Sequence, residues 1–209
     1  MVTKAKREPL SRRRVLEAGV RYVDREGLEA LSMRKLGAEL GVEAMSLYNH
    51  VPNKSALLDG MVEVLLGGLS IPPKDENWEE RIRGAYRALR LVAREHPNVF
   101  PLLMERPPDT MDGVWLVEEF LETLRGAGFE TETALHAFRA LSSYVTGYAM
   151  SEIRGFAMEP AGTRPGALEL PPEKFPRLSE LRPVLGKVDR DAEFEFGLDL
   201  IFAGLRARL

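Results

Sequence analysis

The chain has 209 residues, of which 44% are hydrophobic and 29% are charged, a composition typical of a globular protein with a buried core. It contains no cysteine, which excludes disulfides, thiolate zinc sites and cysteine nucleophiles. Its apolar runs are far shorter than the ~18 residues of a membrane-spanning helix, and no apolar run of the signal-peptide kind follows its basic start. We therefore expect a cytoplasmic protein.

The net charge of −3 hides an uneven distribution along the chain. Residues 1–54 carry 11 Lys and Arg against 7 Asp and Glu, whereas the rest of the chain carries 18 against 25. A basic N-terminal part on an acidic body is typical of a protein that meets phosphates at one end only. The first ten residues are interpreted as a frayed basic terminus, with an arm that contacts phosphates as the alternative.

Two helices near the N-terminus are predicted on either side of a smaller unit, and the first of them is expected to brace that unit. The first begins after Ser11, whose hydroxyl can cap the free N–H groups of the first turn, and runs to about Glu26. Gly27 is suited to ending it. The second runs from about residue 54 to residue 66, where paired glycines follow.

The segment between these helices predicts a helix-turn-helix. Ser32 can cap a short helix that carries apolar residues on one side and ends at Gly41, which tolerates the left-handed backbone of a tight turn. A second short helix is expected from Glu43 or Ala44 to just before Pro52. Two short helices joined in this way allow the second to enter a DNA major groove.

The rest of the chain also reads as helical, because apolar residues recur at helical spacing without an alternating strand pattern. The glycines and prolines of residues 67–73 indicate a domain boundary, so we expect one domain at 1–68 and a second at 69–209. Residues 158–178 contain five prolines and little periodicity, and are interpreted as a flexible loop. Further helices are expected, in chain order, over residues 79–95, 98–104, 111–127, 132–156, 178–185 and 190–209.

Residues 40–58 carry a specific pattern, Leu-Tyr-x-His-Val-x-Asn-Lys-x-Ala-Leu-Leu. This pattern resembles the DNA-reading segment of the tetracycline-repressor (TetR) family, strongly over about residues 11–66 and more weakly to the C-terminus. The resemblance implies an all-α fold, with an N-terminal three-helix helix-turn-helix DNA-binding domain and a C-terminal helical ligand-binding and dimerisation domain. It also implies a dimeric repressor that binds a near-palindromic operator and is released by a small-molecule effector. A helical adaptor that does not bind DNA is the alternative.

The resemblance assigns operator contacts to positions on both helices of the helix-turn-helix. The guanidinium fork of Arg34 matches a guanine edge or a phosphate, and Tyr48 suits a phosphate unless it is a packing aromatic. Ala44 and Met45 offer only apolar contact, for example to a thymine methyl group. The complete expected set is Met33, Arg34, Ala44, Met45, Ser46, Tyr48, Asn49, His50 and Lys54.

An effector pocket is expected among the helices of the second domain. Tetracycline repressors use a histidine to hold a magnesium–drug complex, but the corresponding stretch here, residues 98–103, has none. We therefore expect an apolar or aromatic effector, and neither a metal nor a cofactor, although His96 and His136 leave a weak metal alternative. Candidate pocket residues, each with ordinary core packing as its alternative, are His96, Phe100, Met104, Trp115, Phe120, His136, Phe138, Tyr144 and Tyr148.

The last helix indicates how the chain assembles. Gly197 and Gly204 are seven residues apart and so lie on nearly the same helix face. Each glycine costs a helix about 1 kcal/mol relative to alanine, which a close helix–helix approach would offset, within the chain or between chains. Residues 194–201 resemble the final helix of tetracycline-repressor C-terminal domains, which forms a four-helix dimer interface with the long helix before it. We therefore expect a homodimer through the helices around residues 132–156 and 190–209.

No enzyme motif appears in the sequence. Gly-x-Ser-x-Gly, phosphate-loop and dinucleotide-binding patterns are all missing. The carboxylates of Glu118, Glu119 and Glu122 are interpreted as a solvated helix face. We therefore expect a protein that is not an enzyme.

Overall fold

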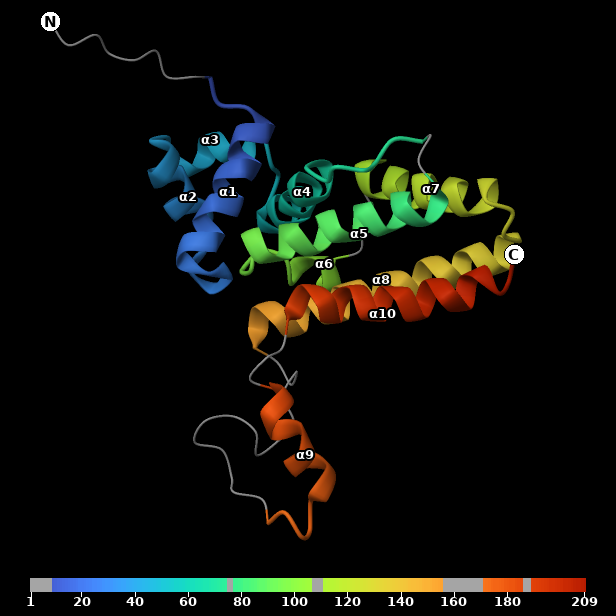
Figure 1. Cartoon of the computed structure of the whole chain (residues 1–209). Coiled ribbons are helices and arrows are strands. Elements are labelled where there is room, and N and C mark those ends of the chain that lie inside the picture. Colours follow the sequence, from blue (N-terminus) through green and yellow to red (C-terminus); the bar gives the residue numbers. More distant parts are fainter. Residues whose placement is uncertain (1–8, 75–76, 107–110, 156–170, 186–188) are drawn as a thin grey trace, which may run out of the picture. The chain divides into compact units, whose positions relative to one another are not determined.

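The computed structural model describes residues 9–74, 77–106, 111–155, 171–185 and 189–209 (Figure 1). All regular secondary structure within these ranges is helical, which confirms the expected all-α fold. The elements are α1 (Arg12–Glu26), a 3₁₀ turn (Leu28–Ala30), α2 (Met33–Leu40), α3 (Ala44–Tyr48), α4 (Lys54–Gly67), α5 (Trp78–Glu95), α6 (Leu102–Glu105), α7 (Met111–Gly126), α8 (Thr131–Arg154), α9 (Pro176–Leu185) and α10 (Arg190–Arg206).

The chain forms two compact units. The first contains the chain up to residue 70 together with residues 91–118, and the second contains residues 71–90 and 119–209. Helices α5 and α7 therefore contribute to both units. Most of the loop expected at 158–178 lies outside the described residues, and α9 begins within its last few residues. No described helix has the length and apolar character needed to cross a bilayer.

In the first unit, α1 and α4 pack closely because glycines stand at their contact. A Cβ added to Gly60 would lie 2.4 Å from Cδ2 of Leu16, and one added to Gly19 would lie 3.1 Å from Sδ of Met61. Leu16 and Met61 are both buried. The two flanking helices predicted from the sequence are thus present, and their side chains form the core beneath the helix-turn-helix.

The predicted helix starts and the tight turn are confirmed. The side chains of Ser11, Ser32 and Asn53 each accept a hydrogen bond from the main-chain N–H group three residues later, at 3.2, 3.3 and 2.8 Å. Gly41 adopts the left-handed conformation, with φ 68° and ψ 36°. Gly37 lies where α2 meets α3, since a Cβ there would be 2.9 Å from the carbonyl oxygen of Val42.

Two predicted helices are shorter than expected. Residues 97–101 form turns, and only α6 is helical in the predicted stretch 98–104. Pro101 lacks the N–H group that would continue a helix there. Helix α3 likewise ends at Tyr48, and the chain turns before Pro52, which disfavours helical geometry in the residue that precedes it.

In the second unit, an arginine face on α5 binds α10. Arg83 donates hydrogen bonds to Glu195 and Asp199, both at 2.7 Å, and Arg87 donates to Glu195 at 2.6 Å. The guanidinium of Arg83 also lies over the ring of Phe202, 4.9 Å from its centroid. The hydrogen bond from Arg87 lowers the pKa of Glu195, so this carboxylate remains charged at neutral pH. These contacts fix the rotation of α10 about its axis.

The solvated face predicted for the α7 carboxylates is wrong for Glu119. This residue is only 7% exposed, and its carboxylate binds Arg81 at 2.7 Å and Lys74 at 3.0 Å. The hydrogen bond from Arg81, followed by that from Lys74, lowers its pKa. Glu118 and Glu122 are exposed as expected. The arginine partner, distant in sequence, is what makes burial of Glu119 possible.

The contact at Gly37 generates a stability prediction. Gly37→Ala should lower the free energy of unfolding by roughly 1–3 kcal/mol, because the added methyl group meets main-chain atoms that cannot move aside. Gly67→Ala is the matched control, since a Cβ there has no neighbour within 4 Å, and its stability should stay level or rise by up to about 1 kcal/mol. Urea titration followed by circular dichroism measures both. Equal stability of the two variants would contradict the proposed close approach.

Candidate nucleic-acid interface and effector site

Helix α3 turns one residue into the core and the others outward. Leu47 is fully buried and anchors the helix, whereas Met45 is 73% and Tyr48 41% exposed. Asn49 is exposed, and Ala44, Ser46 and His50 are half-buried. An exposed methionine and tyrosine on a helix this short are not explained by packing. The predicted base-reading and phosphate-contacting positions on and directly after α3 are therefore all at least partly accessible.

The two predicted contacts on α2 differ in accessibility. The side chain of Arg34 is exposed and forms no hydrogen bond or ion pair with the parts of the chain that the structure describes. Met33 is only 8% exposed, so its side chain belongs to the core of the first unit. What Met33 can offer a phosphate is its main-chain N–H group in the first turn of α2.

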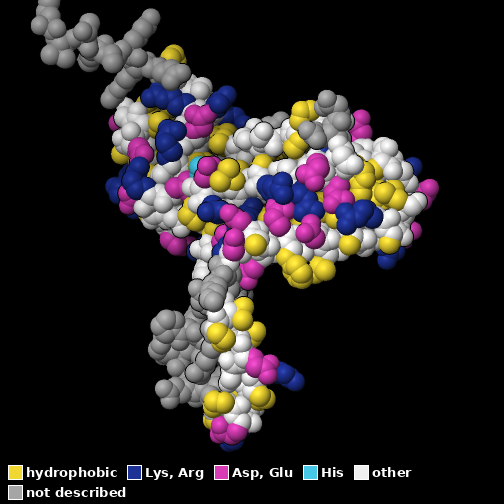
Figure 2. All heavy atoms as spheres, in the orientation of Figure 1, with side chains coloured by type: hydrophobic (Ala, Val, Ile, Leu, Met, Phe, Trp, Pro, Cys, Tyr) yellow, Lys and Arg dark blue, Asp and Glu magenta, His cyan; other side chains and the backbone are white. Residues whose placement is uncertain are grey.

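The side chain of Lys54 has a hydrogen-bond partner within the chain. Its Nζ donates a hydrogen bond to the main-chain oxygen of Leu31 at 2.9 Å, joining the start of α4 to the residue before the α2 cap. Arg25 and Glu39 form an ion pair that similarly joins α1 to α2. Figure 2 shows further Lys and Arg side chains over the surface of this part of the chain. The helix-turn-helix is thus held in shape by polar contacts at both of its ends.

Two of the predicted effector residues meet in an aromatic cluster of the second unit. Phe120 of α7 packs against Phe138 of α8, with ring centroids 5.5 Å apart. Tyr86 of α5 lies 4.8 Å from Phe120, and its hydroxyl is 2.9 Å from the Ser142 hydroxyl. Burial raises the pKa of Tyr86, which is therefore neutral. Neither Tyr86 nor its polar partner Ser142 was among the expected effector residues, because the contact joins residues 56 positions apart.

Tyr144 and Tyr148 join α8 to the first turns of α10. Their hydroxyls donate hydrogen bonds to the main-chain oxygens of Phe194 and Arg190, at 2.9 and 2.8 Å. Both rings pack against the ring of Phe194, and burial raises the pKa of each tyrosine. These two predicted pocket residues thus join two helices, and both also line a groove of about 920 Å³ beside α10.

The remaining predicted effector residues are not gathered in one site. Phe100 is fully buried, Met104 and Trp115 are 57% and 58% exposed, and all three belong to the first unit. His136 is exposed on α8. In the described part of the chain, no three His, Cys, Asp or Glu side chains come together in a way that could hold a metal ion.

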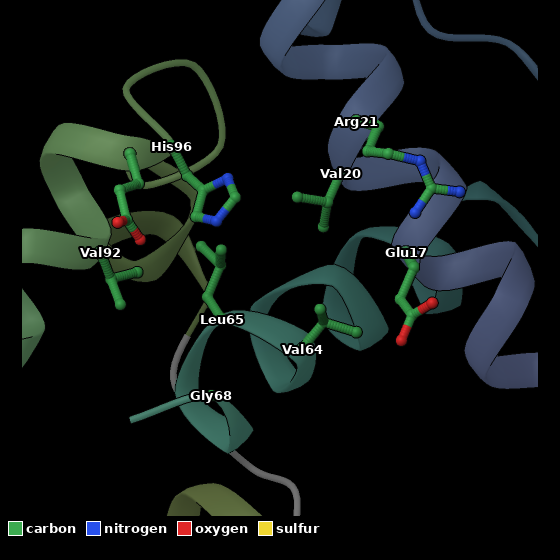
Figure 3. Close-up of a pocket in the computed structure, with 9 residues that line it drawn as sticks. Glu17, Val20, Arg21, Val64, Leu65, Gly68, Val92 and His96 are labelled. Carbon is green, nitrogen blue, oxygen red and sulfur yellow. The ribbon is translucent and has the colours of Figure 1, made fainter. Parts of the chain in front are cut away.

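His96 borders a cavity of about 260 Å³ between α1, α4 and the end of α5 (Figure 3). Val20, Val64 and Leu65 supply apolar walls, and Glu17 stands at the α1 side. The Nδ1 atom of His96 lies 2.6 Å from Oδ2 of Asp24. This histidine thus contacts the helix that braces the helix-turn-helix.

The outward face of α10 is apolar and open. Phe196 is 65% and Leu200 61% exposed, and hydrophobic side chains protrude along the lower edge of α10 in Figure 2. Gly197 faces inward, since a Cβ there would lie 2.1 Å from the Tyr144 hydroxyl oxygen. A Cβ on Gly204 would have no neighbour within 4 Å. The two glycines therefore differ. Gly197 permits a close contact with Tyr144 within the chain, whereas Gly204 leaves free space on the surface of α10.

Comparison with known proteins agrees with this arrangement of helices. Residues 15–61 match the model of bacterial regulatory proteins of the tetR family, and residues 71–209 match the tetracyclin repressor-like C-terminal domain. The chain is 32% identical to the HTH-type transcriptional repressor DrrR1 of Streptomyces coeruleorubidus, over 92% of this chain and 76% of that protein. It is 32% identical to the tetracycline repressor protein class G of Vibrio anguillarum, over 91% and 90% of the two chains.

A solved structure is similar along nearly the whole chain. The TetR family protein ActR of Streptomyces coelicolor, in complex with actinorhodin, superimposes with a TM-score of 0.81 at 34% identity, covering 96% of this chain and 98% of that chain. Family models, relatives and fold agree. The chain belongs to the TetR family of bacterial regulatory proteins, and is a dimeric, ligand-responsive DNA-binding repressor and not an enzyme.

Proposed function

We propose that this repressor reads a near-palindromic operator in the cytoplasm through the exposed faces of α2 and α3, and releases it when an aromatic small molecule binds among α5, α7 and α8. Residues 1–68 would supply DNA reading, and residues 69–209 effector binding and dimerisation. The proposal rests on one observation about α3: the side chains of Met45 and Tyr48 are exposed to solvent, while Leu47 between them is buried in the core.

The proposed DNA contacts follow from side-chain chemistry. Arg34 is free to bind guanine or phosphate, and the hydroxyl of Tyr48 can donate to a phosphate oxygen. Met45 supplies an apolar contact that favours a thymine methyl group. Lys54 would reach a phosphate only by leaving the Leu31 carbonyl, so we assign it a supporting role. A non-DNA-binding adaptor is not favoured, because it would not explain this surface.

The proposed dimer interface is the outward face of α10 together with α8. A groove of about 920 Å³ lies on this face, and Phe196, Leu200 and Val184 line part of it. A second copy of the chain is its proposed occupant, since a twofold axis would bring two copies of the same apolar face together. Gly204 and Gly147, which have free space beside their Cα atoms, would allow the helices to approach closely.

The proposed effector site is the cluster of Tyr86, Phe120, Phe138 and Ser142. Aromatic rings offer an effector flat apolar surface, and the neutral tyrosine and serine hydroxyls supply hydrogen bonds. The structure of ActR with actinorhodin shows that a similar chain accommodates a small molecule. An aromatic effector with hydrogen-bonding groups fits these residues best.

DNA reading is tested with an operator selected from random duplexes by the purified protein. Arg34→Ala and Tyr48→Phe should each weaken operator binding by about 1–3 kcal/mol in fluorescence anisotropy, with the fold unchanged. Arg177→Ala is the control for the charge change, because Arg177 is an exposed arginine on α9. Operator affinity that falls equally in the control would show a general charge effect and contradict the assigned contacts.

The dimer interface is tested by placing a charge on it. Phe196→Asp or Leu200→Asp should raise the dimer dissociation constant about a hundredfold or more, because each substitution buries two unpaired carboxylates across the twofold axis. Leu91→Asp, at a residue that is 52% exposed on α5, should leave the dimer intact. Sedimentation equilibrium distinguishes these results. Dimers that survive both α10 substitutions would refute the proposed interface.

The effector site is tested by calorimetry with a panel of polycyclic aromatic compounds and with a tetracycline, with and without Mg²⁺. At least one aromatic compound should bind and lower operator affinity. Phe120→Ala should weaken that binding by about 2 kcal/mol or more through loss of stacking area. Phe175→Ala, at an exposed phenylalanine before α9, should not. If the folded dimer gives no heat of binding with any aromatic compound of the panel, the proposal of an aromatic effector loses its support.

A further inference from the structure

The cavity between α1, α4 and the end of α5 has the size of a small-molecule site (Figure 3). Its volume is about 260 Å³, and an apolar protein cavity of about 150 Å³ is already large enough to bind benzene. All of the residues that line it belong to the first unit, whereas the proposed effector cluster belongs to the second. The cavity is therefore separate from the site proposed above for the effector.

The walls of this cavity are apolar side chains that the core holds in place. Val20 of α1 and Leu65 of α4 are only 4% and 3% exposed, and Val64 and Val92 are half-buried. The glycine contacts between α1 and α4 fix the two helices that carry the first three of these side chains. The apolar surface is thus already formed, and a compact apolar group that enters the cavity would be removed from water.

Charged groups of both signs line the same cavity. Arg21 of α1 and Glu95 of α5 are exposed, and neither forms an ion pair with any residue that the structure describes. Glu17 also lines the cavity, but its carboxylate binds Arg13 at 2.7 Å. Figure 3 shows Arg21 and Glu17 on α1, and His96 on the opposite side of the cavity. One guanidinium and one carboxylate beside the apolar walls therefore remain available to a ligand.

We propose that this cavity is a second ligand site, and that its ligand is a zwitterion with a compact apolar body, the chemistry of an apolar α-amino acid. The carboxylate of the ligand would bind the guanidinium of Arg21, and its ammonium would bind the carboxylate of Glu95. Its side chain would occupy the space between the apolar walls. An amine or an acid of the same shape would use only one of the two protein charges. This inference does not depend on DNA reading or on the proposed effector cluster.

Methyl NMR of the full-length wild-type protein, titrated with L-phenylalanine and with L-leucine, tests where the ligand binds. With at least one of them, we expect saturable shifts at a dissociation constant of about 0.1–1 mM. The methyl signals that should shift are those of Val20, Val64, Leu65 and Val92. Those of Val114, which is exposed on α7, should stay in place. If neither amino acid shifts the cavity signals at concentrations up to about 20 mM, the inference is wrong.

The charge pairing is tested with two ligands that each lack one charge of phenylalanine. Phenethylamine has no carboxylate, and hydrocinnamate has no ammonium. Arg21→Gln should weaken phenylalanine binding about three- to fivefold without weakening phenethylamine binding. Glu95→Gln should weaken phenylalanine binding by a similar factor without weakening hydrocinnamate binding.

Matched substitutions outside the cavity control for the change of net charge. Arg208→Gln and Glu105→Gln alter exposed residues that do not line the cavity, and should leave all three affinities at wild-type values. Because Arg21 and Glu95 are themselves exposed, their substitution should leave the fold intact. If both cavity variants bind phenylalanine as tightly as wild type, or if each weakens all three ligands equally, the assignment of a zwitterion is overturned.

Discussion

The reading surface depends on one close approach of main chains. Gly37 brings α2 against the residues that begin α3, and Gly41 reverses the chain between them in a conformation that side chains disfavour. With the backbones this close, Leu47 reaches the core and serves as the anchor of a helix only five residues long. Everything opposite that anchor must then face outward. The exposure of Met45 and Tyr48 is thus a geometric consequence of two glycines.

The body of the protein is organised by polar contacts of a different kind. Along α5, arginines bind carboxylates of α10 in the second unit, and directly after the same helix His96 binds Asp24 in the first. Helix α5 therefore carries the arginines that orient the proposed dimer face. It also carries Tyr86 of the aromatic cluster, and it leads directly into His96.

Helix caps and tight turns could be predicted from the sequence, whereas contacts between side chains far apart in the sequence could not. The caps at Ser11 and Ser32 and the turn at Gly41 depend on neighbouring residues, and the structure confirms them. The burial of Glu119 depends on Arg81, 38 positions away, and the sequence gives no sign of that pairing. Tyr144 and Tyr148 line a groove, but the hydrogen bonds of their hydroxyls to the main chain of α10 could not be predicted, because the acceptors lie more than 40 residues away. The DNA-contacting residues stay a prediction, and the sequence pattern could propose them because they lie in one continuous segment.

We propose that two chains read one operator through paired α3 helices. Native mass spectrometry of the protein on duplexes recovered from a random library tests it most directly. We expect two chains per duplex, on sequences with an inverted repeat whose half-sites are centred about one helical turn, or a multiple of it, apart. One chain per duplex, or recovered sequences without twofold symmetry, would contradict the account.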